Sequence, residues 1–125
     1  MPANHPEELH ELFVAAVNHH DLDALVALYE PDAVGVDLEG KPVAGAAALR
    51  KFLGGFLSRV QSMAGDTRRA HRNGDLALLS SSWRATLAAG PGGGPFTVEG
   101  TSAEIARRQP DGTWRLFIDD PAFTA

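Results

Sequence analysis

Apolar residues recur at helical spacing in the N-terminal half of this chain. The first such stretch follows Pro6, which suits the first turn of a helix because its missing N–H would be unpaired there. The apolar positions are Leu9, Leu12, Phe13, Ala16 and Val17. Intervals of three and four residues place these side chains on one face, so the pattern predicts a helix that ends near residues 18–20.

Two further helices are predicted. Asp21 is a suitable N-cap for a short helix that Pro31 would close. The apolar positions of this helix are Leu22, Leu25, Val26 and Tyr29. The third helix has the strongest pattern, with apolar positions Leu49, Phe52, Leu53, Phe56, Leu57 and Val60. Gly54 and Gly55 interrupt it at about 1 kcal/mol each relative to Ala, which indicates close backbone packing or a bend.

The segment between the second and third helices contains a predicted strand at residues 33–38, AVGVDL. Strand alternation places Val34, Val36 and Leu38 on one face and Ala33, Gly35 and Asp37 on the other. The second set combines small residues with one acid, which suits a pocket wall and an exposed strand equally well. The following EGKPVAG is predicted to be a turn-rich connection.

After Gly65 the pattern changes to strands. TRRAHR is expected to have one face in water, and LALLSSSWRATLA follows an Asn-Gly-Asp turn. FTVEGTSAEIARR and, after a PDG turn, TWRLFID complete a set of four antiparallel strands. AGPGGGP is a loop without the following helix or the Lys-Ser/Thr pair of a phosphate-binding loop. This order predicts an α+β fold with helices on one face of a curved antiparallel sheet.

Composition narrows the class of protein. A chain of 125 residues is expected to form a single domain over residues 1–125. The formal net charge of -5 argues against a nucleic-acid partner. The local run of Arg68, Arg69 and Arg72 is interpreted as a solvated strand face.

The chain contains no cysteine, which excludes disulfides and thiolate metal sites. Its five histidines lack metal-ligand spacing, so we do not expect a metal site. We expect no cofactor either. The first residues do not form a signal-peptide pattern, and no stretch approaches the roughly 20 apolar residues of a membrane span. We therefore expect a cytoplasmic protein without a membrane partner.

Most of the chain resembles a known family. Residues 13–37, FVAAVNHHDLDALVALYEPDAVGVD, resemble the N-terminal region of ketosteroid isomerases almost position for position. VAGAAALRKFL is similar to the start of that family's third helix, and GDLALLSSSW, EIARR and DGTWRLFIDDP fit its C-terminal sheet. The resemblance is to the NTF2-like superfamily, which includes ketosteroid isomerases and SnoaL-like polyketide cyclases. It implies a cone in which three N-terminal helices pack in the concavity of a strongly curved, mostly antiparallel sheet, and it implies a homodimer.

The same resemblance implies a pocket with two acids. Asp37 falls where ketosteroid isomerases have their catalytic base, and Glu104 falls where they have a protonated Asp that donates to the substrate oxygen. Phe13 stands in place of their hydrogen-bonding tyrosine, and a phenyl ring cannot donate. Losing one such donor typically costs about 10²–10³ in rate, which disfavours steroid isomerisation itself. An acid–base pair remains the hypothesis.

Each acid also has a purely structural interpretation. Asp37 could be a turn residue whose carboxylate accepts backbone N–H groups. Glu104 could pair with Arg84 or lie exposed, although it shares a strand face with small residues. Asp119 and Asp120, which end the last strand before Pro121, are interpreted as turn residues, although in this fold that strand end can lie near the pocket mouth.

The expected pocket is lined by aromatic side chains, for which core packing is the alternative. These candidates are Phe13, Tyr29, Phe52, Phe56 and Trp83. The Tyr29 hydroxyl could replace the donor that is missing at Phe13. Three functions stay open. The first is an isomerase, cyclase or lyase that acts on a small hydrophobic carbonyl compound, with Asp37 as base and Glu104 as proton donor. The second is a non-catalytic module that binds an apolar ligand. A dimeric structural module with a filled cavity is a third.

Overall fold

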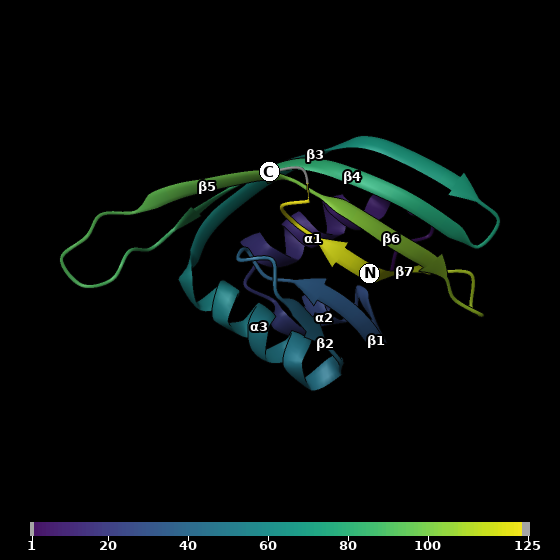
Figure 1. The fold of residues 1–125 in the computed structure, drawn as a ribbon, viewed down its shortest axis with the longest axis horizontal. Helices are drawn as coiled ribbons and strands as arrows, with labels where there is room; N and C mark the ends of the chain where they lie inside the picture. Colours follow the sequence, from purple (N-terminus) through teal and green to yellow (C-terminus); the bar gives the residue numbers. More distant parts are fainter. Residues whose placement is uncertain (1, 124–125) are drawn as a thin grey trace.

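The computed structural model describes residues 2–123, which form three helices and one seven-stranded sheet (Figure 1). The helices are α1 (Glu8–Asn18), α2 (Leu22–Val26) and α3 (Ala46–Arg59). The strands are β1 (Tyr29–Val36), β2 (Pro42–Ala44), β3 (Val60–Asn73), β4 (Leu76–Leu87), β5 (Phe96–Thr101), β6 (Ala103–Arg108) and β7 (Trp114–Asp120).

The strands are ordered β2-β1-β7-β6-β4-β3, and β5 pairs with β4 beyond the end of β6. Neighbouring strands are antiparallel except for β1 and β7, which are parallel. Figure 1 shows β3, β4 and β6 arching over α1, with α3 on the same side of the molecule. Register shifts within the β3–β4 and β6–β7 pairs are bulges, and bulges bend a sheet locally. The predicted α+β architecture is confirmed.

Strand alternation separates the two faces of β4. Its inward residues are buried: Ala77, Leu79, Ser81, Trp83, Ala85 and Leu87. Its outward residues include Leu76 and Leu78, whose exposed fractions are 50% and 52%. The inward face packs on buried leucines of the helices, and each fully buried leucine is worth about 1.5–3 kcal/mol. This core holds α1 and α3 in the concavity of the sheet.

The second helix is shorter than predicted. Asp21 caps it, because its carboxylate accepts the N–H of Ala24 at 3.0 Å. The helix ends at Val26, so the prediction that it continues through Tyr29 to Pro31 is wrong. Tyr29 begins β1 instead and is paired with Leu116 of β7. The energy of sheet pairing outweighs a helical pattern that spans little more than two turns.

Three strand boundaries also differ from the prediction. The connection EGKPVAG contains β2, and β3 begins at Val60, before the change predicted after Gly65. FTVEGTSAEIARR is two strands, β5 and β6, which separate at Ser102. The break is associated with a contact to β4, because the Ser102 hydroxyl accepts the N–H of Ser81 at 2.9 Å. The side chain of Ser102 thereby takes the place of a backbone acceptor, and five strands follow α3 instead of four.

Candidate functional site

A cavity of about 700 Å³ lies between α3, α1 and the concave face of the sheet. Its walls are mostly apolar and include Phe13, Leu49, Phe52, Leu53, Phe56, Met63, Trp83 and Leu87. Small-molecule sites typically occupy about 300–1,000 Å³ and combine apolar walls with a few polar groups. The cavity therefore has the size and the lining of a ligand site.

All five aromatic residues singled out in the sequence contribute to these walls. Phe52 and Phe56 are four residues apart in α3, which places both rings on one face of the helix. Trp83 donates its indole N–H to the carbonyl of Pro121 at 2.7 Å and so fixes the segment after β7. Gly100 lies against this indole, because a Cβ there would be 3.0 Å from Trp83 Cζ2. Contact of these rings with a ligand remains a prediction.

Two carboxyl groups lie on the sheet wall of the cavity. Glu104 of β6 and Asp119 of β7 are directly opposite each other in the register of the two strands, and both line the cavity. The Glu104 side chain is 6% exposed, and Asp119 is partly buried. Like charges directly opposite each other on a sheet repel, so the pair favours one shared negative charge over two.

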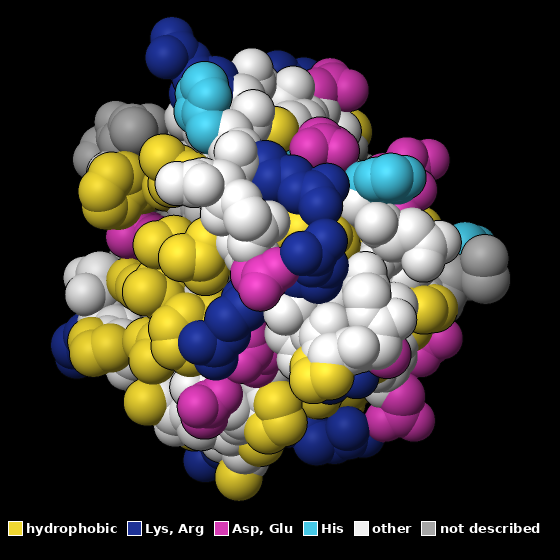
Figure 2. All heavy atoms as spheres, turned by 90° about the vertical axis from the view of Figure 1, so that its right-hand side faces the viewer, with side chains coloured by type: hydrophobic (Ala, Val, Ile, Leu, Met, Phe, Trp, Pro, Cys, Tyr) yellow, Lys and Arg dark blue, Asp and Glu magenta, His cyan; other side chains and the backbone are white. Residues whose placement is uncertain are grey.

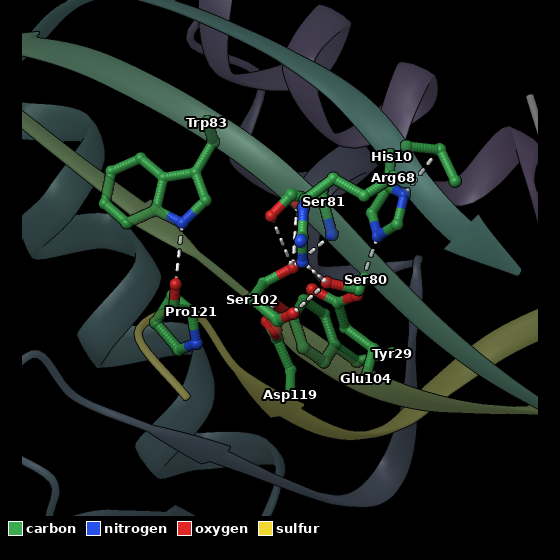
Figure 3. A network of polar contacts seen from close by, with 11 residues as sticks. His10, Tyr29, Arg68, Ser80, Ser81, Trp83, Ser102, Glu104, Asp119 and Pro121 are labelled. Atoms are coloured by element: carbon green, nitrogen blue, oxygen red, sulfur yellow. Dashed lines mark hydrogen bonds and ion pairs between the residues drawn. The ribbon is translucent and has the colours of Figure 1, made fainter. Parts of the chain in front are cut away.

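Tyr29 of β1 completes this end of the cavity. Its hydroxyl donates to Asp119 Oδ2 at 2.5 Å (Figure 3). Burial raises the pKa of the Tyr29 hydroxyl well above its ordinary value, and the neighbouring Asp119 adds to the rise. Burial likewise raises the pKa of Asp119 to about 8, with a further contribution from Glu104 and an opposing one from the Tyr29 hydrogen bond. Asp119 is therefore predominantly a neutral acid at pH 7.

His10 of α1 reaches the same cluster from the other side. Its Nε2 lies 2.7 Å from Glu104 Oε1, and its Nδ1 lies 2.7 Å from Thr67 Oγ1 of β3. Figure 3 shows His10, Tyr29, Glu104 and Asp119 meeting from four elements of the fold. A continuous set of polar contacts therefore runs from Thr67 to Tyr29.

A second buried glutamate, Glu30, differs from the Glu104–Asp119 pair in having an arginine partner. Glu30 of β1 is held by Arg107, whose Nε and Nη2 donate to its two oxygens at 2.8 and 2.6 Å. The Arg107 hydrogen bonds lower the pKa of Glu30. Within residues 2–123, no arginine or lysine forms such a pair with Glu104 or Asp119. Glu30 has the partner expected of a structural carboxylate, whereas the cavity pair has only His10 and Tyr29.

Asp37 lies elsewhere in the cavity wall. Its Oδ1 accepts the backbone N–H groups of Glu39 and Lys41, each at 2.9 Å, and so closes the turn between β1 and β2. Gly35, the partner of Asp119, is two residues earlier in the chain, which corresponds to about 7 Å along a strand. No hydrogen bond joins Asp37 to Glu104 or Asp119 in the described residues. The pairing of Asp37 with Glu104 stays a prediction.

The sequence interpretation missed two members of the cluster. Asp119 was interpreted as a turn residue because it ends the last strand just before Pro121. A bulge in β7 adds Phe117, so Ile118 faces outward at 39% exposure and Asp119 faces the cavity. His10 had one usable signal, its position three residues before Phe13 on the same helix face. Arg84 pairs with Glu99 at 3.4 Å and not with Glu104.

The described residues provide no group of three histidines or acids that could hold a metal ion. Among the helices of residues 2–123, none is long and apolar enough to cross a membrane. Exposed residues of both charges, Glu39, Lys51 and Arg59, border the cavity.

Comparison with known proteins places this geometry in a family. Residues 10–116 match the model of the SnoaL-like domain. A comparison with curated protein sequences found no match.

Solved structures show the same fold at low identity. A ketosteroid isomerase-like protein from Erwinia carotovora atroseptica SCRI1043 superposes with a TM-score of 0.81 at 19% identity, covering 91% of this chain and 89% of that one. An NTF2-like superfamily protein from Salmonella enterica serovar Typhimurium LT2 gives 0.77 at 16% identity, covering 95% and 90%. A putative aromatic ring hydroxylase from Novosphingobium aromaticivorans gives 0.75 at 24% identity, covering 94% and 85%. This chain therefore belongs to the SnoaL-like family, and it shares the fold of ketosteroid isomerase-like and NTF2-like proteins.

Proposed function

We propose that this protein binds a small hydrophobic carbonyl compound in the cavity and transfers a proton on it. The Glu104–Asp119 pair would serve as the acid and the base. One observation carries the proposal: the two carboxyl groups face each other on the wall of a mostly apolar cavity, and no arginine or lysine of the described residues pairs with either of them. Ionisable groups with strongly shifted pKa values in a pocket are typical of functional sites.

The proposed chemistry needs a donor and an acceptor for protons. Asp119, neutral at pH 7, would donate a hydrogen bond to the carbonyl oxygen and stabilise the charge that develops there. Glu104 would take the proton from the carbon next to the carbonyl and return it to the same or a neighbouring carbon. Tyr29 occupies Oδ2 of Asp119, which leaves the carboxyl proton of Asp119 on Oδ1, available to Glu104 or to a ligand oxygen.

Asp37 remains an alternative base. The turn engages only its Oδ1, and Asp37 is one of the residues that line the cavity. A base at this position would act on a different part of the ligand from the one next to Asp119. The two assignments predict different variants to be inactive.

Solvent exchange of acidic C–H groups tests the proposal. The probe is 2-tetralone, a bicyclic ketone, in D₂O, with loss of its α-proton signal followed by NMR. We expect the wild-type protein to accelerate exchange, and Asp119→Asn and Glu104→Gln each to lower the rate by about 10²–10³, as for other positioned donors and bases. Asp120→Asn is the matched control, because the Asp120 carboxylate accepts the N–H of Ala122. Equal rates in all four proteins would refute the assignment.

The second candidate is a binding module without chemistry. The extent of the apolar wall favours it, because such a wall retains a hydrophobic ligand whether or not a proton moves. In that case 2-tetralone would bind, as seen by chemical-shift changes of Leu49 and Leu53 methyl groups, without any acceleration of exchange.

We further propose that the outer face of the sheet pairs with a second copy of the chain. Leu78, Ile105 and Ile118 are in register across β4, β6 and β7 on this face. At the end of the molecule that Figure 2 shows, which is the right-hand side of Figure 1, hydrophobic side chains lie beside a band of arginine and lysine side chains. Sedimentation velocity should show a dimer that Leu78→Glu dissociates, and a monomeric wild-type protein would contradict this.

A further inference from the structure

We infer that Thr67 and His10 form a proton relay between solvent and the Glu104–Asp119 pair. The relay passes through the contact between α1 and β3 and not through the interior of the cavity. The acid–base proposal does not require this route. The use of the relay during turnover, however, rests on that proposal. The route would let the pair exchange protons with water while a ligand fills the cavity.

The first argument is continuity. Thr67 is exposed on β3, which is an edge strand of the sheet, whereas Glu104 is buried on β6. The imidazole of His10 bridges them with 2.7 Å contacts on both of its nitrogens. Proton transfer requires heavy atoms about 2.6–3.2 Å apart, and both contacts satisfy this. Glu104 then contacts Asp119, and Asp119 accepts from Tyr29.

The second argument is that imidazole can pass a proton from one nitrogen to the other. With Nε2–H donating to Glu104, the neutral ring accepts the Thr67 hydroxyl at Nδ1. For inward transfer, Thr67 gives its hydroxyl proton to Nδ1 and takes one from water, while the Nε2 proton moves to Glu104 Oε1. The other oxygen of Glu104 can share that proton with Asp119. The reverse sequence returns one proton to water, so the ring gains and loses one proton in each transfer.

The third argument concerns competing partners. Within residues 2–123, the ionisable side chain in hydrogen-bond contact with this ring is Glu104 of β6, which lies opposite Asp119 of β7, and Asp119 in turn binds Tyr29 of β1. Across the described residues, no arginine or lysine forms an ion pair with either acid. A fixed cation beside Glu104 would compete with His10 for the carboxylate oxygens. Its absence leaves the proton free to move between Glu104 and His10.

The relay is tested by proton exchange in a filled cavity. The cavity is saturated with trans-decalin, which is apolar and cannot hydrogen-bond, and filling is verified by shifts of the Leu49 and Leu53 methyl signals. NMR then measures how fast the Tyr29 hydroxyl proton, which is bound to Asp119, exchanges with water. His10→Gln keeps an N–H for Glu104 but cannot pass a proton, and Thr67→Val removes the hydroxyl at nearly constant shape.

We expect both variants to slow this exchange by about 10²-fold, the lower end of the effect of a positioned proton-transfer group. His19→Gln, an exposed change next to the end of the same helix, should leave the exchange rate unchanged. Equal exchange in the wild-type, His10→Gln and Thr67→Val proteins would overturn the relay. Failure of decalin to exclude water would overturn it too, because the open cavity would then be the route.

The outcome is separable from that of the acid–base proposal. Slower exchange in the variants together with no turnover of 2-tetralone would support the relay and refute the catalytic function. Turnover of 2-tetralone together with unchanged exchange of the Tyr29 hydroxyl proton in the variants would refute the relay and support the catalytic function. If His10→Gln fails to fold, as judged by circular dichroism, Thr67→Val alone decides, since it removes one hydroxyl and leaves the imidazole in place.

Discussion

The cavity contains carboxyl groups in two different settings. Asp37 accepts two backbone N–H groups in a turn, which keeps its carboxylate engaged with the chain itself. Glu104 and Asp119 face each other across two strands, and their contacts are with one another, His10 and Tyr29. The backbone of a turn stabilises a charge, whereas an apolar wall and a second acid oppose one. A carboxylate in the first setting supports structure, and a pair in the second can hold and release a proton.

The comparison is tested most directly by measuring the free energy of unfolding as a function of pH with and without the Asp119 carboxyl group. The pKa of Asp119 is raised from 3.8 to about 8 by folding, so the folded state binds its proton more tightly than the unfolded state does. The stability that this group contributes is complete below its unfolded pKa and is lost as pH rises toward about 8. Asp119→Asn cannot lose a proton.

We therefore expect Asp119→Asn to gain stability relative to the wild-type protein as pH rises from about 4 to about 9, with a plateau above the folded pKa. Urea unfolding at several pH values measures the difference. Curves that run parallel over this range would show that Asp119 is not buried as an acid. If the variant's stability advantage over the wild-type protein grew as pH falls, folding would lower the pKa of Asp119 instead of raising it.

Substitutions of Asp37 in the turn give a second test of the comparison, with a smaller expected effect. Asp37→Ala removes the acceptor of two N–H groups and should destabilise the protein by about 1–2 kcal/mol. Asp37→Asn keeps a side-chain oxygen for these groups and should cost less. If Glu104 is the base, both variants should still exchange the α-protons of 2-tetralone. Loss of exchange in Asp37→Asn at full stability would make Asp37 the base instead.

The fold could be predicted from the sequence to a large extent. Apolar periodicity located α1 and α3, and the acid at position 21 located the start of α2. The boundaries that failed depend on partners distant in sequence. Tyr29 belongs to a strand because β7 lies beside it, and no local pattern contains that information. The break at Ser102 likewise depends on Ser81 in a neighbouring strand.

The site was less predictable for the same reason. Glu104 was singled out because the resemblance to ketosteroid isomerases places it at one of their acid positions, and small residues on the same strand face supported an inward orientation. Asp119 was missed because alternation fails at Phe117, where β7 carries one more residue than β6. His10 was missed because a histidine on an amphipathic helix shows only which face it occupies. Its contacts with Thr67 and Glu104 join residues far apart in the chain.

The extra residue in β7 has a consequence for how such a cavity changes in evolution. If β7 had no bulge and Phe117 were paired with Ile105, regular alternation would turn Ile118 toward the cavity in place of Asp119. Deleting Phe117 would remove the bulge but leave Asp119 opposite Glu104, so the way in which β7 pairs with β6 determines whether an acid or an isoleucine faces Glu104 in the cavity. A bulge gained or lost in β7 can therefore change the chemistry of such a cavity, and members of this family should be compared at that position before activities are transferred.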